Sequence, residues 1–304
     1  MVQPLEHLLD IESLDTVRIR SLLERAAVIR AKPRRYRDAG AGRLLVNLFY
    51  EPSTRTRFSF EIAALRLGMQ VVNFAAAGSS VSKGETLLDS FKTLEAMGAG
   101  IIVVRHPDNG AVAGLAAAAG AHTRVINAGD GSHAHPSQAL LDAFTLQQHF
   151  EDLSAIRILI AGDLRHSRVT RSDLAIFRKL GVGEVRLAAP PQLQPDQRTS
   201  AGAAIHERLE DALDGVNAVM MLRIQRERQA QSALPDAVAY HREWGLTAER
   251  LALAAPDCIV MHPGPMNRGV EIASEVADGP QSVILEQVRN GVWMRMAILE
   301  AMLA

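Results

Sequence analysis

Residues 44–62 read LLVNLFYEPSTRTRFSFEI, and this stretch decides how the rest of the chain is interpreted. It begins with an apolar run, residues 44–49, whose length and leucine and valine content are typical of a buried strand. After a short polar connection, Phe58, Ile62 and Leu65 recur at intervals of three and four, which predicts an amphipathic helix. A strand that leads directly into a helix is the repeating unit of parallel α/β proteins.

The same alternation continues along the whole chain. Short apolar runs predict strands at residues 44–49, 70–74, 101–104, 124–126, 157–161, 184–188, 217–221 and 258–261. A helical pattern from Pro136 to Phe150 separates the first four runs from the last four, with proline in its first turn, where no N–H is needed. Residues 223–243 are polar without an apolar period and are expected to form a surface loop. The sequence therefore predicts an α/β protein of two domains, each a mainly parallel sheet of about four strands flanked by helices.

The domain boundaries follow from the same reading. We assign residues 1–138 to a first domain and residues 139–280 to a second. Residues 281–304 predict a terminal helix with one apolar face, formed by Ile284, Val288, Val292, Met296, Leu299 and Leu303. Such a helix must pack against a core, and we expect it to return to the first domain.

Composition excludes several classes of protein. The 304 residues are 48% hydrophobic, and 33 basic residues balance 34 acidic ones to a net charge of −1, so no global field favours nucleic acid or a membrane surface. Cys258 is the only cysteine, which excludes an intramolecular disulfide, and no residues stand at zinc-ligand spacing. The N-terminal residues lack a basic segment followed by an apolar core, so we expect a cytoplasmic protein.

The polar connection after the first strand has the composition of an anion site. A helix N-terminus offers unpaired backbone N–H groups and a partial positive charge, which stabilise phosphate. Ser53, Thr54 and Thr56 add hydroxyl donors there, and Arg55 adds a planar fork that can bind two phosphate oxygens. The alternative interpretation is an ordinary capped helix, because serine and threonine cap helices in any protein.

The motifs taken together carry a resemblance to a known family. They are Ser53-Thr54-Arg55-Thr56-Arg57-Phe58, Ser82-Lys83-Gly84-Glu85-Thr86, Arg105, His135-Pro136-Ser137-Gln138, Gly162-Asp163-Leu164 with Arg168, Arg223-Ile224-Gln225, and His262-Pro263-Gly264-Pro265. In order and separation this series resembles the aspartate and ornithine carbamoyltransferase superfamily over essentially the full chain. The resemblance implies transfer of the carbamoyl group of carbamoyl phosphate to an amino acid, without a cofactor or a metal ion.

The resemblance also implies roles for residues of the first domain. Ser53, Thr54, Arg55 and Thr56 would hold the phosphate, which Arg105 would also reach. With Thr56, two further residues, Arg105 and His135, would contact the carbamoyl oxygen and stabilise the oxyanion that develops there. Gln138 would bind the carbamoyl NH2 group. Considered singly, Arg105 is also compatible with an exposed loop arginine, and His135 with a helix cap or, together with His133, half of a metal site.

The second domain is expected to bind the acceptor. By the resemblance, Arg168, Arg223 and Gln225 would bind two carboxylates, with Gly264 and Pro265 lining the site through main-chain carbonyls. Arginines suit a dicarboxylate and would repel the cationic side chain of ornithine, so we expect L-aspartate as acceptor and a place in de novo pyrimidine biosynthesis. Ornithine or another amino acid is the alternative acceptor, and a purely structural turn is the alternative for Gly264-Pro265.

The resemblance further implies a homotrimer with active sites shared between subunits. Lys83, with Ser79 or Ser80, would reach the site of a neighbouring subunit, and regulatory or dihydroorotase-like chains could join a larger assembly. Two other classes of protein are alternatives to a carbamoyltransferase. A nucleotide-dependent oxidoreductase is suggested by Ile160-Ala161-Gly162-Asp163, but the glycine fingerprint is incomplete. A non-catalytic binding subunit would be expected to lack site residues, and every motif is present.

Overall fold

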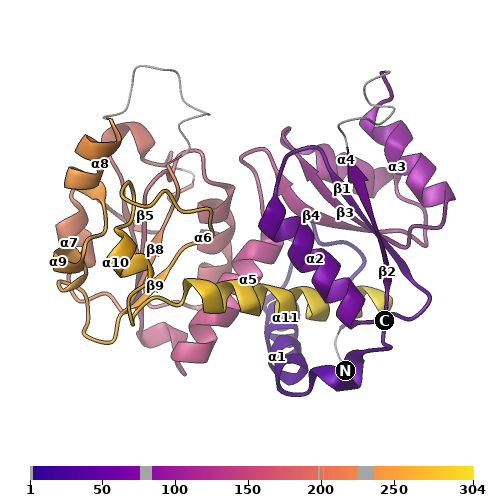
Figure 1. Ribbon diagram of the computed structural model, residues 1–304, viewed down its shortest axis with the longest axis horizontal. Coiled ribbons are helices and arrows are strands. Elements are labelled where there is room, and N and C mark those ends of the chain that lie inside the picture. Colours follow the sequence, from indigo (N-terminus) through magenta and orange to yellow (C-terminus); the bar gives the residue numbers. More distant parts are fainter. Residues whose placement is uncertain (1–2, 76–83, 198, 201, 225–235) are drawn as a thin grey trace. The chain divides into compact units, whose positions relative to one another are not determined.

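The computed structural model describes residues 3–75, 84–197, 199–200, 202–224 and 236–304 (Figure 1). The chain forms two compact units. Unit 1 contains Met1–Phe144 with Val288–Ala304, and unit 2 contains Thr145–Gln287. The sequence placed the boundaries after residues 138 and 280, whereas the units change within helix α5 (Pro136–His149) and helix α11 (Ile284–Leu303). A helix that continues from one unit into the next gives no polar linker in the sequence, so local composition could not locate these boundaries.

Unit 1 is built on a four-stranded parallel sheet. The strand order is β2 (Gln70–Ala75), β1 (Leu44–Phe49), β3 (Ile101–His106) and β4 (Arg124–Asp130). The helices of this unit are α1 (Thr16–Ala31), the 3-10 turn η1 (Pro33–Tyr36), α2 (Thr54–Arg66), α3 (Leu87–Ala96), α4 (Ala111–Ala118), the first part of α5 and most of α11. Each predicted strand of the first set is present, and β3 and β4 extend further than predicted.

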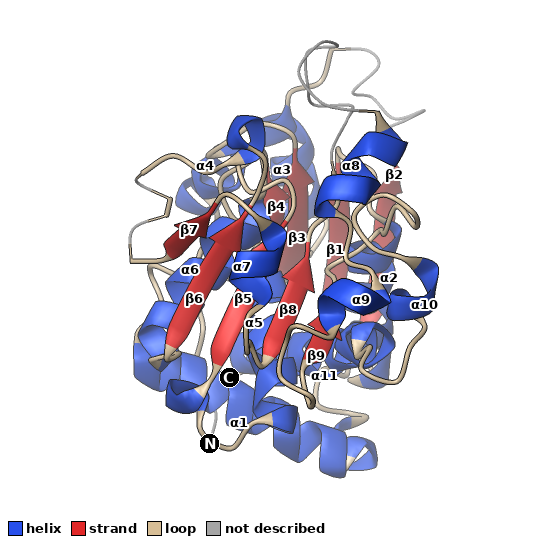
Figure 2. Cartoon of the chain, turned by 90° about the vertical axis from the view of Figure 1, so that its left-hand side faces the viewer, coloured by secondary structure: helices blue, strands red, loops and turns tan. Residues whose placement is uncertain are grey.

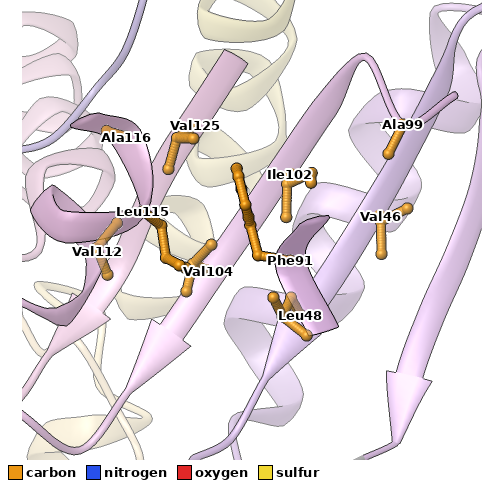
Figure 3. Packing of buried hydrophobic residues seen from close by; sticks show 10 residues of the cluster. All are labelled: Val46, Leu48, Phe91, Ala99, Ile102, Val104, Val112, Leu115, Ala116 and Val125. Atoms are coloured by element: carbon orange, nitrogen blue, oxygen red, sulfur yellow. The ribbon is translucent and has the colours of Figure 1, made fainter. Parts of the chain in front are cut away.

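One face of this sheet packs against α3 and α4 (Figure 3). Val46 and Leu48 of β1 point to this face because side chains of a strand alternate. Ile102 and Val104 of β3 do the same beside them, and Phe91 of α3 belongs to the same buried cluster. Phe91 is fully buried, so burial of this ring contributes on the order of 2 kcal/mol to the stability of unit 1.

The buried face of α2 is not the predicted one. The helix is present, but the stripe that predicted it is exposed: Phe58 is 45%, Ile62 41% and Leu65 57% exposed. Phe60 and Ala63 are buried instead, and α2 packs against β1 and β2 through this narrower face. Ala63 and Ala64 are small, so this part of α2 can lie close to the sheet, and the larger apolar stripe stays on the surface of unit 1.

Unit 2 is built on a five-stranded parallel sheet (Figure 2). The order is β7 (Ala204–His206), β6 (Glu184–Ala188), β5 (Arg157–Ala161), β8 (Ala218–Met221) and β9 (Ile259–Met261). The helical elements of this unit are the 3-10 turns η3 (Leu153–Ala155) and η4 (Pro191–Leu193) and the helices α6 (Arg168–Leu180), α7 (Leu209–Leu213), α8 (Ala237–Trp244), α9 (Ala248–Leu251) and α10 (Ser274–Ala277).

Two predictions for unit 2 are wrong. About four strands were expected, but β7 forms a fifth at the sheet edge; it is three residues long and mostly exposed, so it shows no apolar run. The expected loop 223–243 contains the start of α8, which Asp236 caps by accepting a hydrogen bond from the Ala239 backbone N–H. Tyr240 and Trp244 are the buried side chains of α8, and two such positions in an eight-residue helix are too few to show a period in the sequence.

The C-terminal helix packs on unit 1, as predicted. The Leu5 N–H donates to the Ala301 carbonyl at 2.9 Å, and the Arg25 guanidinium lies 3.0 Å from the Glu300 carboxylate. The fold class is therefore confirmed: two parallel sheets flanked by helices, with the last helix returning to the first unit. Among the described residues, the structure contains no helix both long and apolar enough to cross a bilayer.

Candidate active site

The carboxyl end of β1 leads into α2 through the predicted anion-binding segment. Ser53 is the N-cap residue of α2, with extended backbone angles of φ −158° and ψ 99°. Within the described residues its side chain forms no capping hydrogen bond, and the first turn contains no acidic residue. Thr56 is buried, whereas Thr54 and Arg55 are exposed. The N–H groups of this turn are therefore not satisfied by a cap, which favours an anion site over an ordinary capped helix.

Arg105, near the end of β3, is held by polar groups from both neighbouring strands. Its Nε lies 3.4 Å from Glu51 Oε2, just after β1, and its Nη1 donates to the Ala128 carbonyl of β4 at 3.1 Å. Only 11% of the side chain is exposed. These contacts contradict the alternative of a solvent-exposed loop arginine, because they fix the guanidinium at the carboxyl end of the sheet.

His135 precedes α5 and is 4% exposed. Asp130, the last residue of β4, orders the loop before it by accepting hydrogen bonds from the Ala134 N–H at 3.1 Å and the Asn127 side chain at 2.8 Å. His133 lies on this loop, with Nδ1 3.1 Å from Asp130 Oδ2, and is half exposed. Among the described residues no three metal-ligating side chains gather, so the metal-site alternative has no support there. Asp130 is a positioning residue that sequence reasoning missed.

Gln138, in the first turn of α5, has a defined amide orientation. Its Nε2 donates to both carboxylate oxygens of Asp142, at 3.0 and 3.1 Å, and both side chains are buried. A carboxylate only accepts hydrogen bonds, so the amide oxygen Oε1 must point away from Asp142. Gln138 therefore presents an acceptor, the group that an NH2 of a ligand requires. The spacing of four residues on one helix could have identified this pair from sequence.

A buried cation lies behind this pair. Arg295 of α11 is 3% exposed, its guanidinium carbon lies 5.0 Å from the centre of the Phe60 ring, and burial lowers its pKa to about 10. The negative charge of Asp142 acts in the opposite direction on that pKa. The C-terminal helix thus supplies the charge that stabilises Asp142, which in turn orients Gln138.

In unit 2, β5 and the neighbouring β8 each end in an arginine-bearing segment. Arg168 begins α6 after β5, behind its N-cap Ser167, and is 7% exposed. Arg223 follows β8 and is half-buried. Gly162, at the end of β5, has φ +128°, and an added Cβ would lie 2.3 Å from the Leu222 carbonyl oxygen. Glycine is required here so that the backbone next to Arg223 can approach β5 closely.

The turn after β9 is fixed by its own histidine. The Gly264 N–H donates to His262 Nδ1 at 2.8 Å, so Nδ1 carries no proton and the ring is a neutral Nε2 donor. Gly264 has φ +69°, a conformation that glycine tolerates best, and the peptide bond to Pro265 is cis. His262 Nε2 lies 3.3 Å from Glu271 Oε1, and both residues are fully buried. Glu271 is a further polar residue that sequence reasoning missed.

The predicted site residues fall into two groups, one in each unit. In unit 1 they follow the adjacent strands β1, β3 and β4, and comprise Ser53, Thr54, Arg55, Thr56, Arg105, His135 and Gln138. In unit 2 they follow the adjacent strands β5, β8 and β9, and comprise Arg168, Arg223, Gly264 and Pro265. Lys83, Gln225, Ser79 and Ser80 lie outside the described residues.

Each unit thus has candidate ligand-binding side chains at the carboxyl ends of neighbouring parallel strands, an arrangement typical of a two-domain α/β enzyme for anionic substrates. A family model described as aspartate/ornithine carbamoyltransferase, carbamoyl-P binding domain, matches residues 6–148, and one described as the Asp/Orn binding domain matches residues 154–302. The chain belongs to the aspartate/ornithine carbamoyltransferase family, as its motifs predicted.

Curated relatives and solved structures agree with this membership. The aspartate carbamoyltransferase catalytic subunit of Stenotrophomonas maltophilia is 52% identical, over 98% of this chain and 96% of the relative. The corresponding Xanthomonas axonopodis protein is 53% identical, with the same coverage. Aspartate transcarbamoylase from Trypanosoma cruzi, solved with carbamoyl aspartate and phosphate, has a TM-score of 0.88 at 31% identity, covering 100% of this chain and 99% of that one. Ornithine carbamoyltransferase from Thermus thermophilus has a TM-score of 0.87 at 27% identity, covering 99% of each chain.

Proposed function

We propose that this chain transfers the carbamoyl group of carbamoyl phosphate to the amino group of L-aspartate, giving N-carbamoyl-L-aspartate and phosphate in de novo pyrimidine biosynthesis. The observation that carries this proposal is the placement of Arg168 and Arg223 after the adjacent strands β5 and β8. Two guanidinium groups on neighbouring strands suit an acceptor with two carboxylates. The 52% identical relative is named for the same reaction.

Unit 1 is the proposed carbamoyl-phosphate-binding domain. The N-terminal turn of α2 binds the phosphate through backbone N–H groups, Ser53, Thr54 and Arg55. Thr56 lies in the same turn, and its hydroxyl donates to the carbamoyl oxygen. The buried Thr56 and the fixed geometry of this turn support these roles.

The chemical step needs no covalent intermediate with the protein. The aspartate nitrogen attacks the carbamoyl carbon, the bond from that carbon to the phosphate-bound oxygen breaks, and the departing phosphate takes the proton from nitrogen. Arg105 and His135, with Thr56 and Arg55, stabilise the negative charge that develops on oxygen during attack. Gln138 accepts a hydrogen bond from the carbamoyl NH2 through Oε1, the end of the amide that faces away from Asp142.

Unit 2 is the proposed aspartate-binding domain. Arg168, Arg223 and Gln225 bind the two carboxylates, and Gly264 with Pro265 contributes main-chain carbonyls to the amino group. The fold itself does not select the acceptor, because the Thermus thermophilus ornithine enzyme has nearly the same TM-score as the aspartate enzymes. Selection therefore comes from the two arginines, which attract a diacid and repel a cationic side chain.

The proposed assembly is a cytoplasmic homotrimer whose active sites are shared between subunits. The exposed stripe of α2, formed by Phe58, Ile62 and Leu65, supports burial of this surface by another copy of the chain. Lys83 is proposed to reach the neighbouring site. The relatives are named catalytic subunits, so regulatory or dihydroorotase-like chains are compatible with a larger assembly.

The first test is an assay for ureido products with aspartate and ornithine offered separately. Aspartate should react and ornithine should not, and the reverse result would contradict the proposal.

Arg55→Ala should reduce kcat by at least about a hundredfold, because it removes a positive charge from beside the developing anion. Arg34→Ala is the matched control, since Arg34 is an exposed arginine of η1. Equal activity of the two variants would exclude the assigned role of Arg55.

The shared site is tested by mixing two inactive variants. Lys83→Ala and Arg55→Ala trimers, exchanged by mild dissociation, should recover part of the activity in mixed trimers. If each site is completed within one subunit, mixing gives no recovery.

A further inference from the structure

Glu271 is a fully buried carboxylate of unit 2 that lies in the loop between β9 and α10. Its Oε1 accepts two hydrogen bonds, one from His262 Nε2 at 3.3 Å and one from the Asn267 backbone N–H. A buried carboxylate is costly to desolvate, and a well-packed apolar residue would serve stability alone equally well. Stability alone therefore does not explain a carboxylate at this position. The two hydrogen bonds that it accepts indicate instead that it orders the residues that donate them.

The two donors are the two ends of the turn that contains Gly264 and Pro265. His262 accepts from the Gly264 N–H through Nδ1 at 2.8 Å, and its backbone N–H donates to Gln287 Oε1 at 3.0 Å. Both ring nitrogens of this histidine are thereby used in one protonation state, with the proton on Nε2. Glu271 determines that state, because a carboxylate requires a donor and so selects the tautomer whose Nδ1 is free to accept from Gly264.

The same carboxylate also acts on the segment that follows β8. The Asn267 side chain donates from Nδ2 to the Ile224 carbonyl at 3.3 Å, and Ile224 is the residue after Arg223. Asn267 is held by its backbone N–H on Glu271. Glu271 thus joins the turn after β9 to the arginine-bearing segment after β8, two neighbouring strands of one sheet.

Tyr240 provides a matched control from the same interior. It is 1% exposed, and its hydroxyl and Glu271 Oε2 are both buried without a hydrogen-bond partner among the described residues. Removing that hydroxyl changes a buried polar group that interacts electrostatically with Glu271, without breaking any of the five hydrogen bonds above.

We propose that Glu271 is a positioning residue for the acceptor: it fixes the Gly264-Pro265 turn relative to the segment that carries Arg223. This inference rests on the proposed function, since it assigns those two segments to aspartate. It predicts that loss of the carboxylate misplaces the acceptor groups and leaves carbamoyl phosphate binding, which we assign to unit 1, unchanged.

The experiment compares wild-type enzyme with Glu271→Gln, Asn267→Ala and Tyr240→Phe at a temperature well below their unfolding midpoints. We expect KM for aspartate to rise about tenfold in Glu271→Gln and about threefold in Asn267→Ala, with KM for carbamoyl phosphate within about twofold. Tyr240→Phe should leave both KM values within about twofold. An unchanged aspartate KM in the first two variants, or an equal loss toward both substrates, overturns the proposal.

Hydrogen exchange supplies a readout that does not depend on activity. Peptides covering residues 262–267 should exchange faster in Glu271→Gln than in wild type and remain unchanged in Tyr240→Phe. If the wild-type enzyme formed no carbamoyl aspartate, the proposed function would be wrong. The hydrogen-exchange measurement would still test whether Glu271 orders the turn. Equal exchange in all variants overturns the positioning role, whatever the reaction proves to be. Asn267→Ala keeps the comparison informative if the buried substitution does not fold.

Discussion

Replacing Asp142 with asparagine should destabilise unit 1 by about 3 kcal/mol, the low end of the cost of removing one partner from a buried charge pair. Arg295 is left buried without its acidic neighbour, and burial lowers its pKa to about 10 even while Asp142 is present to raise it. Asparagine keeps one acceptor for Gln138 Nε2, whereas alanine keeps none. Asp142→Ala should therefore lose a further 1–3 kcal/mol or so, the cost of an unsatisfied buried donor.

A double variant separates the charge pair from the general effect of disturbing a core. Arg295→Met alone should cost about 3 kcal/mol, since Asp142 then loses the positive charge of Arg295. If the charges act as a pair, Asp142→Asn with Arg295→Met should cost about 4 kcal/mol and not the sum of about 6, a coupling of about 2 kcal/mol. Strict additivity would refute the reasoning, because it would show that the two charges are energetically independent.

The chain contains two tryptophans, Trp293 in unit 1 and Trp244 in unit 2, which makes the assay specific. In a Trp244→Phe background, urea unfolding followed by tryptophan fluorescence reports on unit 1 alone.

The functional part of the prediction concerns Gln138. An asparagine at position 142 can present its own NH2, so the Gln138 amide loses its fixed orientation and KM for carbamoyl phosphate should rise severalfold. An unchanged KM would show that Asp142 does not orient the amide.

Three further predictions concern unit 2. Cys258 is fully buried and burial raises its pKa to about 12, so a disulfide reagent should label it in urea but not in the native protein near pH 8. Gly162→Ala should cost about 2 kcal/mol or more and raise KM for aspartate, because the new Cβ meets the Leu222 carbonyl next to Arg223; normal stability would contradict the close approach. Burial raises the pKa of Tyr240, so the folded state keeps this proton while the unfolded chain loses it near its ordinary pKa of about 10. Wild-type stability should therefore fall as the pH rises above about 10, and Tyr240→Phe should show a smaller fall in alkaline urea titrations.

The strands could be predicted because a buried parallel strand must be a continuous apolar run. Residues 44–49 and 157–161 were predicted with the bounds that the structure shows. Strand β7 was missed because an edge strand of three exposed residues contributes no such run. The buried face of α2 was predicted wrongly because periodicity identifies an apolar stripe without showing what covers it. A stripe such as that of Phe58 has the same pattern whether it packs on its own sheet or on another molecule.

The site residues were predicted from motifs, whereas the residues that support them were not. Gln138 and Asp142 stand four apart on a helix, so their contact was available from spacing alone. Arg295 is far from Asp142 in the sequence. The two side chains interact only because α11 returns to unit 1, where the positive charge of Arg295 acts on the Asp142 carboxylate. Glu271 was missed for a different reason: an isolated glutamate in a polar loop has the composition of an exposed residue, and burial is a property of the fold.

These supporting acids follow one electrostatic rule in both units. A site for polyanionic substrates needs cations and N–H donors facing the ligand, and a carboxylate directed at the ligand would repel it. A carboxylate placed behind the site has the opposite effect, because it holds donors in fixed positions and leaves acceptors or cations to face outward. Asp142 does this for Gln138 in unit 1, and Glu271 does it for the turn after β9 in unit 2. Preorganisation of this kind reduces the rearrangement needed when charge develops on the substrate. Replacing one of these acids disturbs several substrate contacts at once, so we expect a larger rise in KM than the loss of a single substrate contact would cause.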